Sequence, residues 1–286
     1  MSLVVVSNRV AIPDKRSHVS QGGLAVGLLE ALRERGGTWF GWSGKISENA
    51  SPKQTDIENE NIKFKTIDFT KEEYNVFYQQ YSNGTLWPLF HFRLDLAAFS
   101  HDSYLGYLKV NERFADNLAL IVSQDDLVWV HDYHFLPLAA ALRRKKFTQK
   151  LGYFQHVPWP PKELLQALPN HKELISQLLE YDIIGFQTKS DVRRFLDYVV
   201  NEFSGSIDPT GFVYADRKRT QVKHFPISID FESFSREAQR SETFKSTEQL
   251  KNIVKNTNLI LGVDRLDYSK GINNRLAAYQ TLLEKH

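Results

Sequence analysis

The stretch Leu127-Val128-Trp129-Val130-His131-Asp132-Tyr133-His134 decides the fold. Its first four residues form a short apolar run rich in β-formers, as expected of a strand covered on both faces in a parallel sheet. Two imidazoles, a carboxylate and a phenol follow at once, and residues 138–145 then show a helical pattern. Polar groups at such a junction from strand to helix lie at the carboxyl edge of an open α/β sheet, where these sheets bind their ligands.

Short apolar runs alternate with amphipathic patterns along the rest of the chain. We expect strands at residues 3–7, 39–42, 62–67 (an edge strand), 151–155, 183–187, 220–226 and 259–263, and a polar loop at 45–61. We expect helices at residues 24–33, 70–81 (capped by Thr70 and Glu73), 104–122, 163–168, 172–180, 190–202, 249–256 and 274–285, with a hairpin at 204–218. This order predicts an α/β fold with a doubly wound, mainly parallel sheet.

The polar stretch 231–248 suggests how the chain divides into domains. It is low in apolar residues, so we interpret it as a linker between a Rossmann-like domain at 1–230 and the beginning of a second such domain at 249–286. One strand and one helix cannot close a core, because each leaves an apolar face without a partner. Either the chain is a fragment of a two-domain protein or the last unit docks on the first domain, and we favour the fragment.

The composition is that of an ordinary globular protein and argues against several classes. Basic and acidic side chains number 36 and 34, and the net charge of +2 gives no support for nucleic acid or a membrane as partner. Cysteine is absent, which excludes disulfides and thiolate metal sites and fits a reducing compartment. No apolar run approaches the roughly 20 residues of a membrane helix. The N-terminus enters a strand without a basic leader, so we expect a cytoplasmic protein.

Two features near the N-terminus are suited to an anion. Arg9 directly follows the first strand, and its guanidinium there offers bidentate hydrogen bonds to a phosphate or carboxylate. The alternative is a surface arginine paired with an acidic side chain. Gly22 and Gly23 precede a helix, so a phosphate could approach bare backbone N–H groups at the positive end of the helix dipole. Two glycines at such a junction also occur without any ligand.

Aromatic side chains are dense between residues 39 and 90. The five rings in question are those of Trp39, Trp42, Tyr78, Trp87 and Phe90. Aromatic residues supply the largest burial per residue, so most of them are expected in the core. Sugars, however, dock on flat apolar faces with polar neighbours, and one or two of these rings lining a pocket is the competing interpretation.

The polar groups after the central strand and the next one favour proton chemistry over metal binding. Asp132 is placed to orient or deprotonate a hydroxyl. His156 has the same position after strand 151–155, which brings two polar groups to one sheet edge. His131 and His134 lack a third histidine or an acidic cluster at matching spacing, so we expect no metal.

The run Asp264-Arg-Leu-Asp-Tyr-Ser-Lys-Gly271 carries two cations at the start of a helix. Arg265 and Lys270 can both face one anion, and such a pair suits a diphosphate leaving group, whose charge grows as a bond breaks. The run is not a Walker loop, and GxGxxG is missing, so nicotinamide dinucleotide binding is unsupported. A solvated charged loop is the alternative.

These runs together resemble the trehalose-6-phosphate synthase family, retaining glycosyltransferases (family 20) of the two-domain GT-B fold. The resemblance is carried, in the family's order, by Val4-Val-Val-Ser-Asn-Arg9, Gly22-Gly-Leu, Trp39-Phe-Gly-Trp-Ser-Gly44, Leu86-Trp-Pro88, His91-Phe-Arg93, Trp129-Val-His-Asp-Tyr-His134, His156-Val-Pro158, Gly185-Phe-Gln-Thr188 and Asp264 to Gly271. It implies transfer of glucose from a nucleotide sugar, usually UDP-glucose, to glucose 6-phosphate, with no metal or other cofactor. It leaves open which nucleotide the donor carries (UDP, GDP or ADP) and whether the protein forms a homo-oligomer.

The resemblance also implies roles for individual residues. The acceptor site would be formed by Arg9 on the sugar phosphate together with Tyr78, Trp87, Asp132 and one further tryptophan, for which we weigh Trp42 against Trp39 and choose Trp42. The donor would be bound by Gly22, Gly23, His156, Arg265 and Lys270. Asp132, Arg265 and Lys270 would be the catalytic residues, with retention by front-face attack that needs no protein nucleophile.

One departure from the family is large, and two other interpretations stay open. The family's second domain continues well beyond the point that this sequence reaches, so we expect the chain to be inactive alone. It could instead be a non-catalytic, regulatory domain that binds a sugar phosphate, or an enzyme that makes another glucoside phosphate. A glycoside hydrolase would need two facing carboxylates, and the sequence points only to Asp132.

Overall fold

A computed structural model describes residues 2–12, 23–48, 55–59, 61–255 and 258–285. The chain forms two compact units, Met1–Pro226 and Ile227–His286. The first unit contains all the described strands, and the described residues of the second unit form helices and irregular segments.

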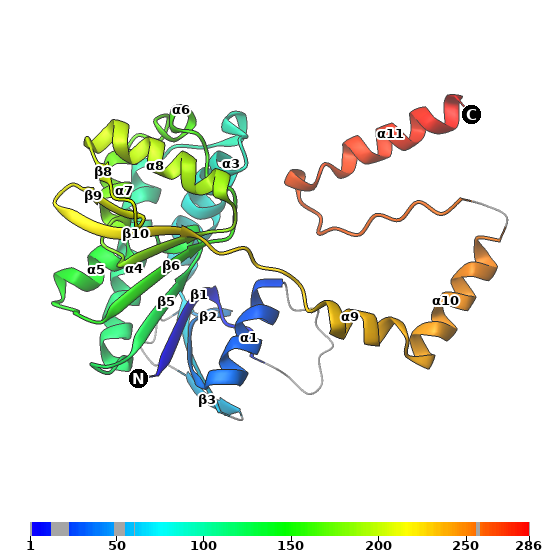
Figure 1. Cartoon of the computed structure of the whole chain (residues 1–286), viewed down its shortest axis with the longest axis horizontal. Helices are drawn as coiled ribbons and strands as arrows, with labels where there is room; N and C mark the ends of the chain where they lie inside the picture. The colour runs from blue at the N-terminus through cyan, green and yellow to red at the C-terminus, as the bar shows by residue number, and fades with distance from the viewer. Residues whose placement is uncertain (1, 13–22, 49–54, 60, 256–257, 286) are drawn as a thin grey trace. The chain divides into compact units, whose positions relative to one another are not determined.

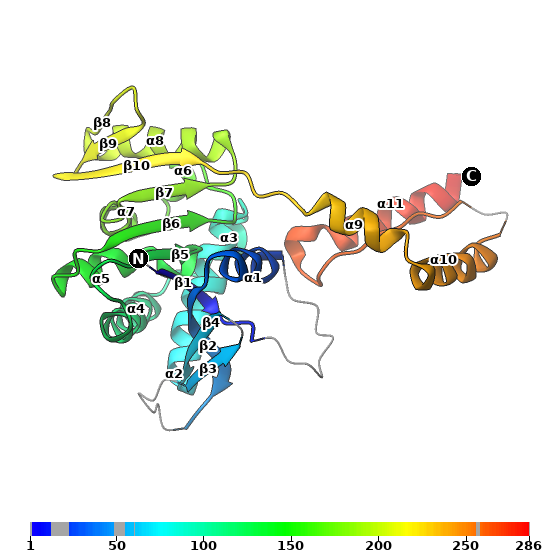
Figure 2. The same ribbon diagram turned by 60° about the horizontal axis from the view of Figure 1, so that its bottom comes forward.

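Ten strands form one sheet within the described residues, in the order β3-β4-β2-β1-β5-β6-β7-β10-β9-β8 (Figures 1 and 2). They are β1 (Leu3–Arg9), β2 (Gly37–Ile46), β3 (Thr55–Asn59), β4 (Ile62–Phe69), β5 (Leu127–His131), β6 (Lys150–Gln155), β7 (Ile183–Phe186), β8 (Ser206–Ile207), β9 (Phe212–Ala215) and β10 (Lys218–His224). Only the pairs β3–β4, β9–β10 and β8–β9 are antiparallel. One half of the sheet extends from β1 and the other half from β5. This order confirms the doubly wound, mainly parallel α/β fold.

The strands β1 and β5 lie side by side where the strand order reverses. In open α/β sheets, ligands bind outside the carboxyl ends of the strands at this switch point. The name switch-point edge is used below for the carboxyl ends of β1, β5 and β6 with the residues that directly follow them. Val4 and Val128 pair in register and are buried on one face of the sheet, as the apolar runs predict.

Helices cover both faces of the sheet unequally. Buried side chains of α1 (Gly23–Arg35) pack on one face with Val5, Trp39 and Phe64. The larger cluster on the other face includes residues of η1 (Tyr74–Leu86), α3 (Trp87–Phe90), α4 (His101–Ile121), α5 (Leu138–Arg144), α6 (Lys162–Leu165), α7 (His171–Leu178) and α8 (Lys189–Phe203). Short 3-10 turns occur at η2 (Leu94–Leu96) and η3 (Tyr133–Phe135).

The helix expected at 70–81 has a different form. Its start is as expected: Thr70 and Glu73 form a capping box in front of α2 (Lys71–Glu73). The continuation is the π-helix η1, and the bond from the N–H of Trp87 to the carbonyl of Ser82 shows its i→i+5 pattern. Rings of η1 contact both the sheet, where Phe77 lies 5.6 Å from Phe69, and α4, where Tyr81 lies 4.6 Å from Tyr107.

The expected loop at 45–61 contains a strand that sequence patterning missed. β3 pairs antiparallel with β4, so β4 is an inner strand and not the edge strand that we expected. All five residues of β3 are exposed, so no apolar alternation marks it in the sequence. Its pairing with β4, not burial, defines the strand.

The second unit differs from expectation at two places. Residues of the expected linker form α9 (Phe231–Ala238) and most of α10 (Ser241–Ile253), and the side chain of Asp230 caps α9. Residues 259–263 form no strand, because a strand needs a hydrogen-bonding neighbour and the described residues of this unit supply none. The last helix, α11 (Ile272–Lys285), is present and follows the short turn η4 (Tyr268–Lys270). The domain assignment itself stays a prediction.

Candidate functional site

The switch-point edge brings together residues that follow three neighbouring strands. Arg9 ends β1, Asp132 follows β5 and His156 follows β6. The N–H of Asp132 donates to the carbonyl of Phe154 at 2.8 Å, and the N–H of His156 donates to Oδ1 of Asp132 at 3.3 Å. The ends of β5 and β6 are therefore tied together directly through the residues predicted to be functional.

Arg9 lies against a glycine and beside an aromatic ring. Its Cζ is 6.0 Å from the ring centroid of Trp42, its partner in the β1–β2 register. A Cβ on Gly44 would lie 2.9 Å from Nε and from Nη2 of Arg9, and Gly44 has φ +88°. The positive φ favours glycine at this position, and the guanidinium of Arg9 lies in the space that a Cβ would occupy. Arg9 is exposed, and no carboxylate within the described ranges forms an ion pair with it.

An aromatic wall stands next to Arg9. We use this name for Trp42, Tyr74, Tyr78 and His134. Trp42 stacks on Phe69 at 5.0 Å and lies 5.5 Å and 5.7 Å from Tyr74 and Tyr78. Tyr78 in turn stacks on His134 at 6.0 Å with 12° between the rings. Tyr78 is only partly buried, so the wall offers an apolar edge beside a cation.

Trp42 and Trp39 lie on opposite faces of the sheet. Trp39 is buried with Phe64 under α1, and its indole N–H donates to the hydroxyl of Ser7 at 2.8 Å. Trp42 belongs to the cluster on the other face, and its N–H donates to the carbonyl of Lys45 at 2.8 Å. Of the two tryptophans weighed for the acceptor site, Trp42 is the one that lies beside Tyr78. Phe90, like Trp39, is fully buried in the core.

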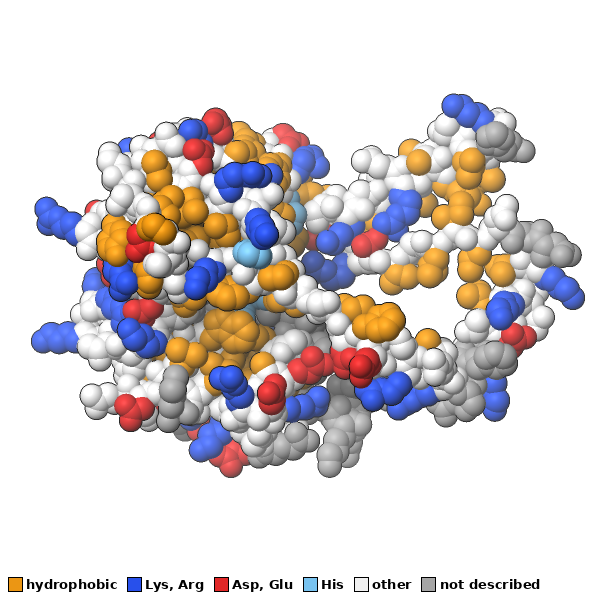
Figure 3. Space-filling model, viewed as in Figure 1, with side chains coloured by type: hydrophobic (Ala, Val, Ile, Leu, Met, Phe, Trp, Pro, Cys, Tyr) orange, Lys and Arg blue, Asp and Glu red, His pale blue; other side chains and the backbone are white. Residues whose placement is uncertain are grey.

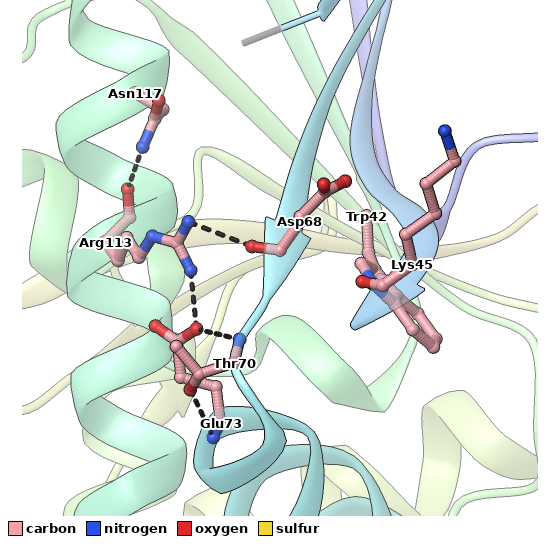
Figure 4. Close-up of polar contacts among 7 residues, drawn as sticks. All are labelled: Trp42, Lys45, Asp68, Thr70, Glu73, Arg113 and Asn117. Atoms are coloured by element: carbon pink, nitrogen blue, oxygen red, sulfur yellow. Dashed lines mark hydrogen bonds and ion pairs between the residues drawn. The ribbon is translucent and has the colours of Figure 1, made fainter. Parts of the chain in front are cut away.

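A polar network fixes the start of η1 against the sheet (Figure 4). One Nη of Arg113 donates to Oε2 of Glu73 at 2.6 Å, and the other donates to the backbone carbonyl of Asp68 at 2.9 Å. Glu73 also accepts from the N–H of Thr70 at 2.8 Å. Helix α4, the capping box and the end of β4 are thereby joined at the base of the helix that carries Tyr78.

Asp132 has a strained backbone and a shifted acidity. Its φ of 73° and ψ of 168° fall in a region that only glycine populates readily, and such residues cluster at active sites. Its Oδ1 also accepts from the N–H of Tyr133 at 3.1 Å. Burial raises the pKa of the Asp132 carboxyl to about 6, although hydrogen bonds from neighbouring backbone N–H groups act in the opposite direction.

Three histidines near Asp132 are neutral at neutral pH. Nδ1 of His131 lies 2.9 Å from Nε2 of His156. Burial holds the pKa of His131 well below its ordinary value and lowers that of His156 to about 4 and that of His134 to about 3. Because these imidazoles are neutral, Arg9 is the residue that carries a positive charge at the switch-point edge, as far as the described residues show.

Trp87 contacts residues that the sequence did not single out for the site. Its ring lies 5.7 Å from that of Tyr133, whose hydroxyl donates to Oδ1 of Asn83 at 3.0 Å. Its carbonyl accepts from Nδ1 of His91 at 2.7 Å. Tyr133 could have been found, since it follows Asp132 in the central stretch. Asn83 has no sequence signal, because its position depends on the π-helical register of η1.

The predicted donor residues are placed only in part. Gly22 lies outside the described residues, and Gly23 begins α1. Arg265 and Lys270 belong to the second unit, where both are exposed. Asp267 caps η4 by accepting from the N–H of Ser269 at 2.9 Å. No described carboxylate of this unit forms an ion pair with either cation.

Two further searches of the described residues gave no result. No group of three or more His, Cys, Asp or Glu side chains among them is arranged to hold a metal ion. None of the helices in that part of the chain combines the length and the apolar character needed to cross a membrane.

Comparison with known proteins finds similarity along the whole chain. Residues 2–286 match the sequence model of the family described as Glycosyltransferase family 20. Trehalose-6-phosphate synthase of Klebsiella pneumoniae is 44% identical over 284 residues, which are 99% of this chain and 59% of that protein. The homologue of Cronobacter sakazakii is 42% identical over 286 residues, with the same 59% share. The chain therefore spans about three fifths of the length of these relatives.

Solved structures agree with the sequence comparison. An alpha,alpha-trehalose-phosphate synthase (UDP-forming) from Burkholderia xenovorans, in complex with glucose-6-phosphate, matches with a TM-score of 0.93 and 40% identity over 99% of this chain and 62% of that one. An E. coli structure bound with UDP-2-fluoro glucose matches with a TM-score of 0.92 and 40% identity over 100% of this chain and 62% of that one. Because the family model matches residues 2–286 of this chain, the chain belongs to glycosyltransferase family 20.

Proposed function

We propose that the first unit binds glucose 6-phosphate as the acceptor in trehalose 6-phosphate synthesis. The observation that carries the proposal is the position of Arg9, a cation without a described ion-pair partner, between the aromatic wall and Asp132 at one sheet edge. The Burkholderia xenovorans relative was solved with glucose-6-phosphate, which supports the same ligand here.

Each part of the site has a chemical task in this proposal. Arg9 holds the phosphate by charge-assisted hydrogen bonds. Tyr78 and Trp87 offer partly exposed rings to the apolar face of the hexose. Asp132 accepts from a sugar hydroxyl, and its carboxyl, with a pKa raised to about 6 by burial, is mostly ionised near pH 7.

The donor in the proposal is UDP-glucose or another nucleotide glucose. The E. coli relative bound with UDP-2-fluoro glucose supports this class. Gly22, Gly23 and His156 would contact the donor from the first unit. Arg265 and Lys270 of the second unit would hold its diphosphate and stabilise the charge that develops on the leaving phosphate.

Retention follows, in the proposal, from attack on the face that the diphosphate leaves. The leaving phosphate oxygen accepts the proton of the acceptor hydroxyl, so no protein nucleophile takes part, and positioning supplies the catalysis. We also propose that residues 1–230 form the acceptor domain and 249–286 the beginning of the donor domain. Because the matched relatives are longer, we expect no UDP release from these 286 residues with both substrates.

Titration calorimetry with glucose 6-phosphate and with glucose tests the acceptor site. Arg9→Ala should weaken the binding of glucose 6-phosphate by roughly 10- to 100-fold, the equivalent of one lost charge-assisted contact. The binding of glucose should change little. Arg219→Ala is the matched control, because Arg219 packs on Phe212 away from the switch-point edge. Equal affinity of glucose 6-phosphate for the parent chain and Arg9→Ala would refute the assignment.

A further inference from the structure

His131 is a buried histidine for which the proposed chemistry has no role. It is the last residue of β5 and is 1% exposed. Its Nδ1 lies 2.9 Å from Nε2 of His156, and its ring centroid lies 4.3 Å from that of Trp129. Since Nε2 of His156 is occupied by this contact, Nδ1 is the ring nitrogen of His156 that remains for a ligand.

The contact between the two rings contains one hydrogen. Of two nitrogens in a neutral pair, one must donate and the other must accept. Burial holds the pKa of His131 well below its ordinary value and lowers that of His156 to about 4. Near pH 7 each ring is therefore neutral and carries a single N–H, and the direction of the hydrogen bond fixes both tautomers.

Nε2 of His131 decides the direction. This nitrogen is buried and has no hydrogen-bond partner among the described residues. If His156 donated, the hydrogen of His131 would lie on Nε2, as a buried N–H without an acceptor. If His131 donates from Nδ1, only a lone pair is left there, and buried donors without partners are rarer in proteins than under-satisfied acceptors.

We propose that His131 is a positioning residue that donates from Nδ1–H to Nε2 of His156 and so keeps the hydrogen of His156 on Nδ1. His156 then presents an N–H donor, not a lone pair, to an oxygen of the nucleotide sugar. The backbone N–H of His156, bound to Oδ1 of Asp132, anchors the same residue from the other side. The ligand part of this inference rests on the proposed function, whereas the direction of the hydrogen bond does not.

Nitrogen-15 NMR of the imidazoles in the ligand-free chain at pH 7.5 measures the tautomers directly. We expect both His131 and His156 to carry their hydrogen on Nδ1. Single substitutions at each position assign the signals. A His156 signal with the hydrogen on Nε2 would overturn the proposal.

Two substitutions of His131 separate its hydrogen bond from its bulk. His131→Asn places an amide near the position of Nδ1, whereas His131→Gln places it near Nε2. In the Asn variant the amide NH2 can donate to Nε2 of His156 in place of Nδ1–H, so we expect His156 to keep its hydrogen on Nδ1. In the Gln variant we expect His156 to populate both tautomers, and far-UV circular dichroism should be unchanged in each variant. Equal tautomer populations in the two folded variants would count against the proposal.

Binding of UDP-glucose, followed by the same NMR signals, tests the ligand part. The Asn variant should bind within about threefold of the parent chain, and the Gln variant about tenfold more weakly, as expected for one misdirected hydrogen bond. Expected tautomers without any UDP-glucose binding would contradict UDP-glucose as the donor in the proposed function and the ligand role of His156 toward it. They would leave the direction of the hydrogen bond standing.

Discussion

Asp132, to which we assign a role in acceptor binding, also has a strained backbone. Its φ of 73° and ψ of 168° cost a non-glycine residue about 1–3 kcal/mol. Asp132→Gly and Asp132→Ala remove the same carboxylate, but only glycine relieves the strain. The greater freedom of glycine in the unfolded chain offsets roughly 0.5–1 kcal/mol of the stability gained in this way. We therefore expect the Gly variant to be more stable than the Ala variant by about 1 kcal/mol in urea unfolding. An Ala variant of equal or greater stability would show that the backbone is unstrained.

The same carboxyl gives stability a defined pH dependence. Its pKa in the folded chain, about 6, lies above the ordinary 3.8 because of burial. The folded state thus binds this proton more tightly, and the contribution of Asp132 to stability falls as pH rises from about 4 to about 6. Between pH 4 and pH 6, the free energy of unfolding of Asp132→Asn should therefore rise by up to about 3 kcal/mol relative to that of the parent chain. Exposed Asp125→Asn is the control; the prediction fails if the gain is the same at pH 4 and pH 7.5.

At the scale of elements, the π-helix η1 depends on close contact with α4. A Cβ on Gly106 of α4 would lie 2.7 Å from Cβ of Val76 in η1. Gly106→Ala should therefore destabilise the chain by about 1–3 kcal/mol, although alanine favours a helix. Gly27→Ala in α1, where nothing lies within 4 Å, should instead stabilise it by roughly 0.5–1 kcal/mol. In the Gly106→Ala background, Val76→Ala should restore part of the lost stability. A double-mutant cycle, measured by urea unfolding, that shows no coupling between positions 76 and 106 would contradict the close contact of η1 with α4.

The elements show what the sequence can and cannot predict. Strands such as β1 and β5 were predicted because burial on both faces leaves a continuous apolar run, and Arg9 and Asp132 followed from their places after these strands. β3 could not be predicted, because its residues are exposed and only its neighbour defines it. Within the aromatic wall, the stacking of Tyr78 on His134 joins η1 to the turn after β5, a tertiary contact that no spacing in the sequence reveals.

At the scale of the molecule, the two units differ in burial. No residue of Ile227–His286 whose burial the structure describes is buried, and apolar side chains lie on the surface of this unit (Figure 3). Leu261, Val263 and Leu266 are among the exposed ones. The apolar run 259–263 was predicted to be a strand from its composition, but composition cannot supply a pairing partner. The core lies in the first unit.

Removal of residues 227–286 should therefore change stability little. With no buried side chain lost among the described residues, we expect the shortened chain to unfold within about 2 °C of the parent Tm, since a loss of 1 kcal/mol would lower Tm by only a few degrees. Differential scanning calorimetry checks this. A fall of 10 °C or more would mean that the second unit stabilises the first.

The most direct test of the account is an NMR titration of the chain with glucose 6-phosphate, followed through the indole N–H signals. The chain has five tryptophans, of which Trp42 and Trp87 lie at the proposed acceptor site and Trp39 on the opposite face of the sheet. We predict that the signals of Trp42 and Trp87 shift on addition of glucose 6-phosphate and that Trp39 does not respond. In Arg9→Ala the same shifts should need roughly 10- to 100-fold more glucose 6-phosphate. Shifts at Trp39 without shifts at Trp42, or an unchanged titration in Arg9→Ala, would contradict the account.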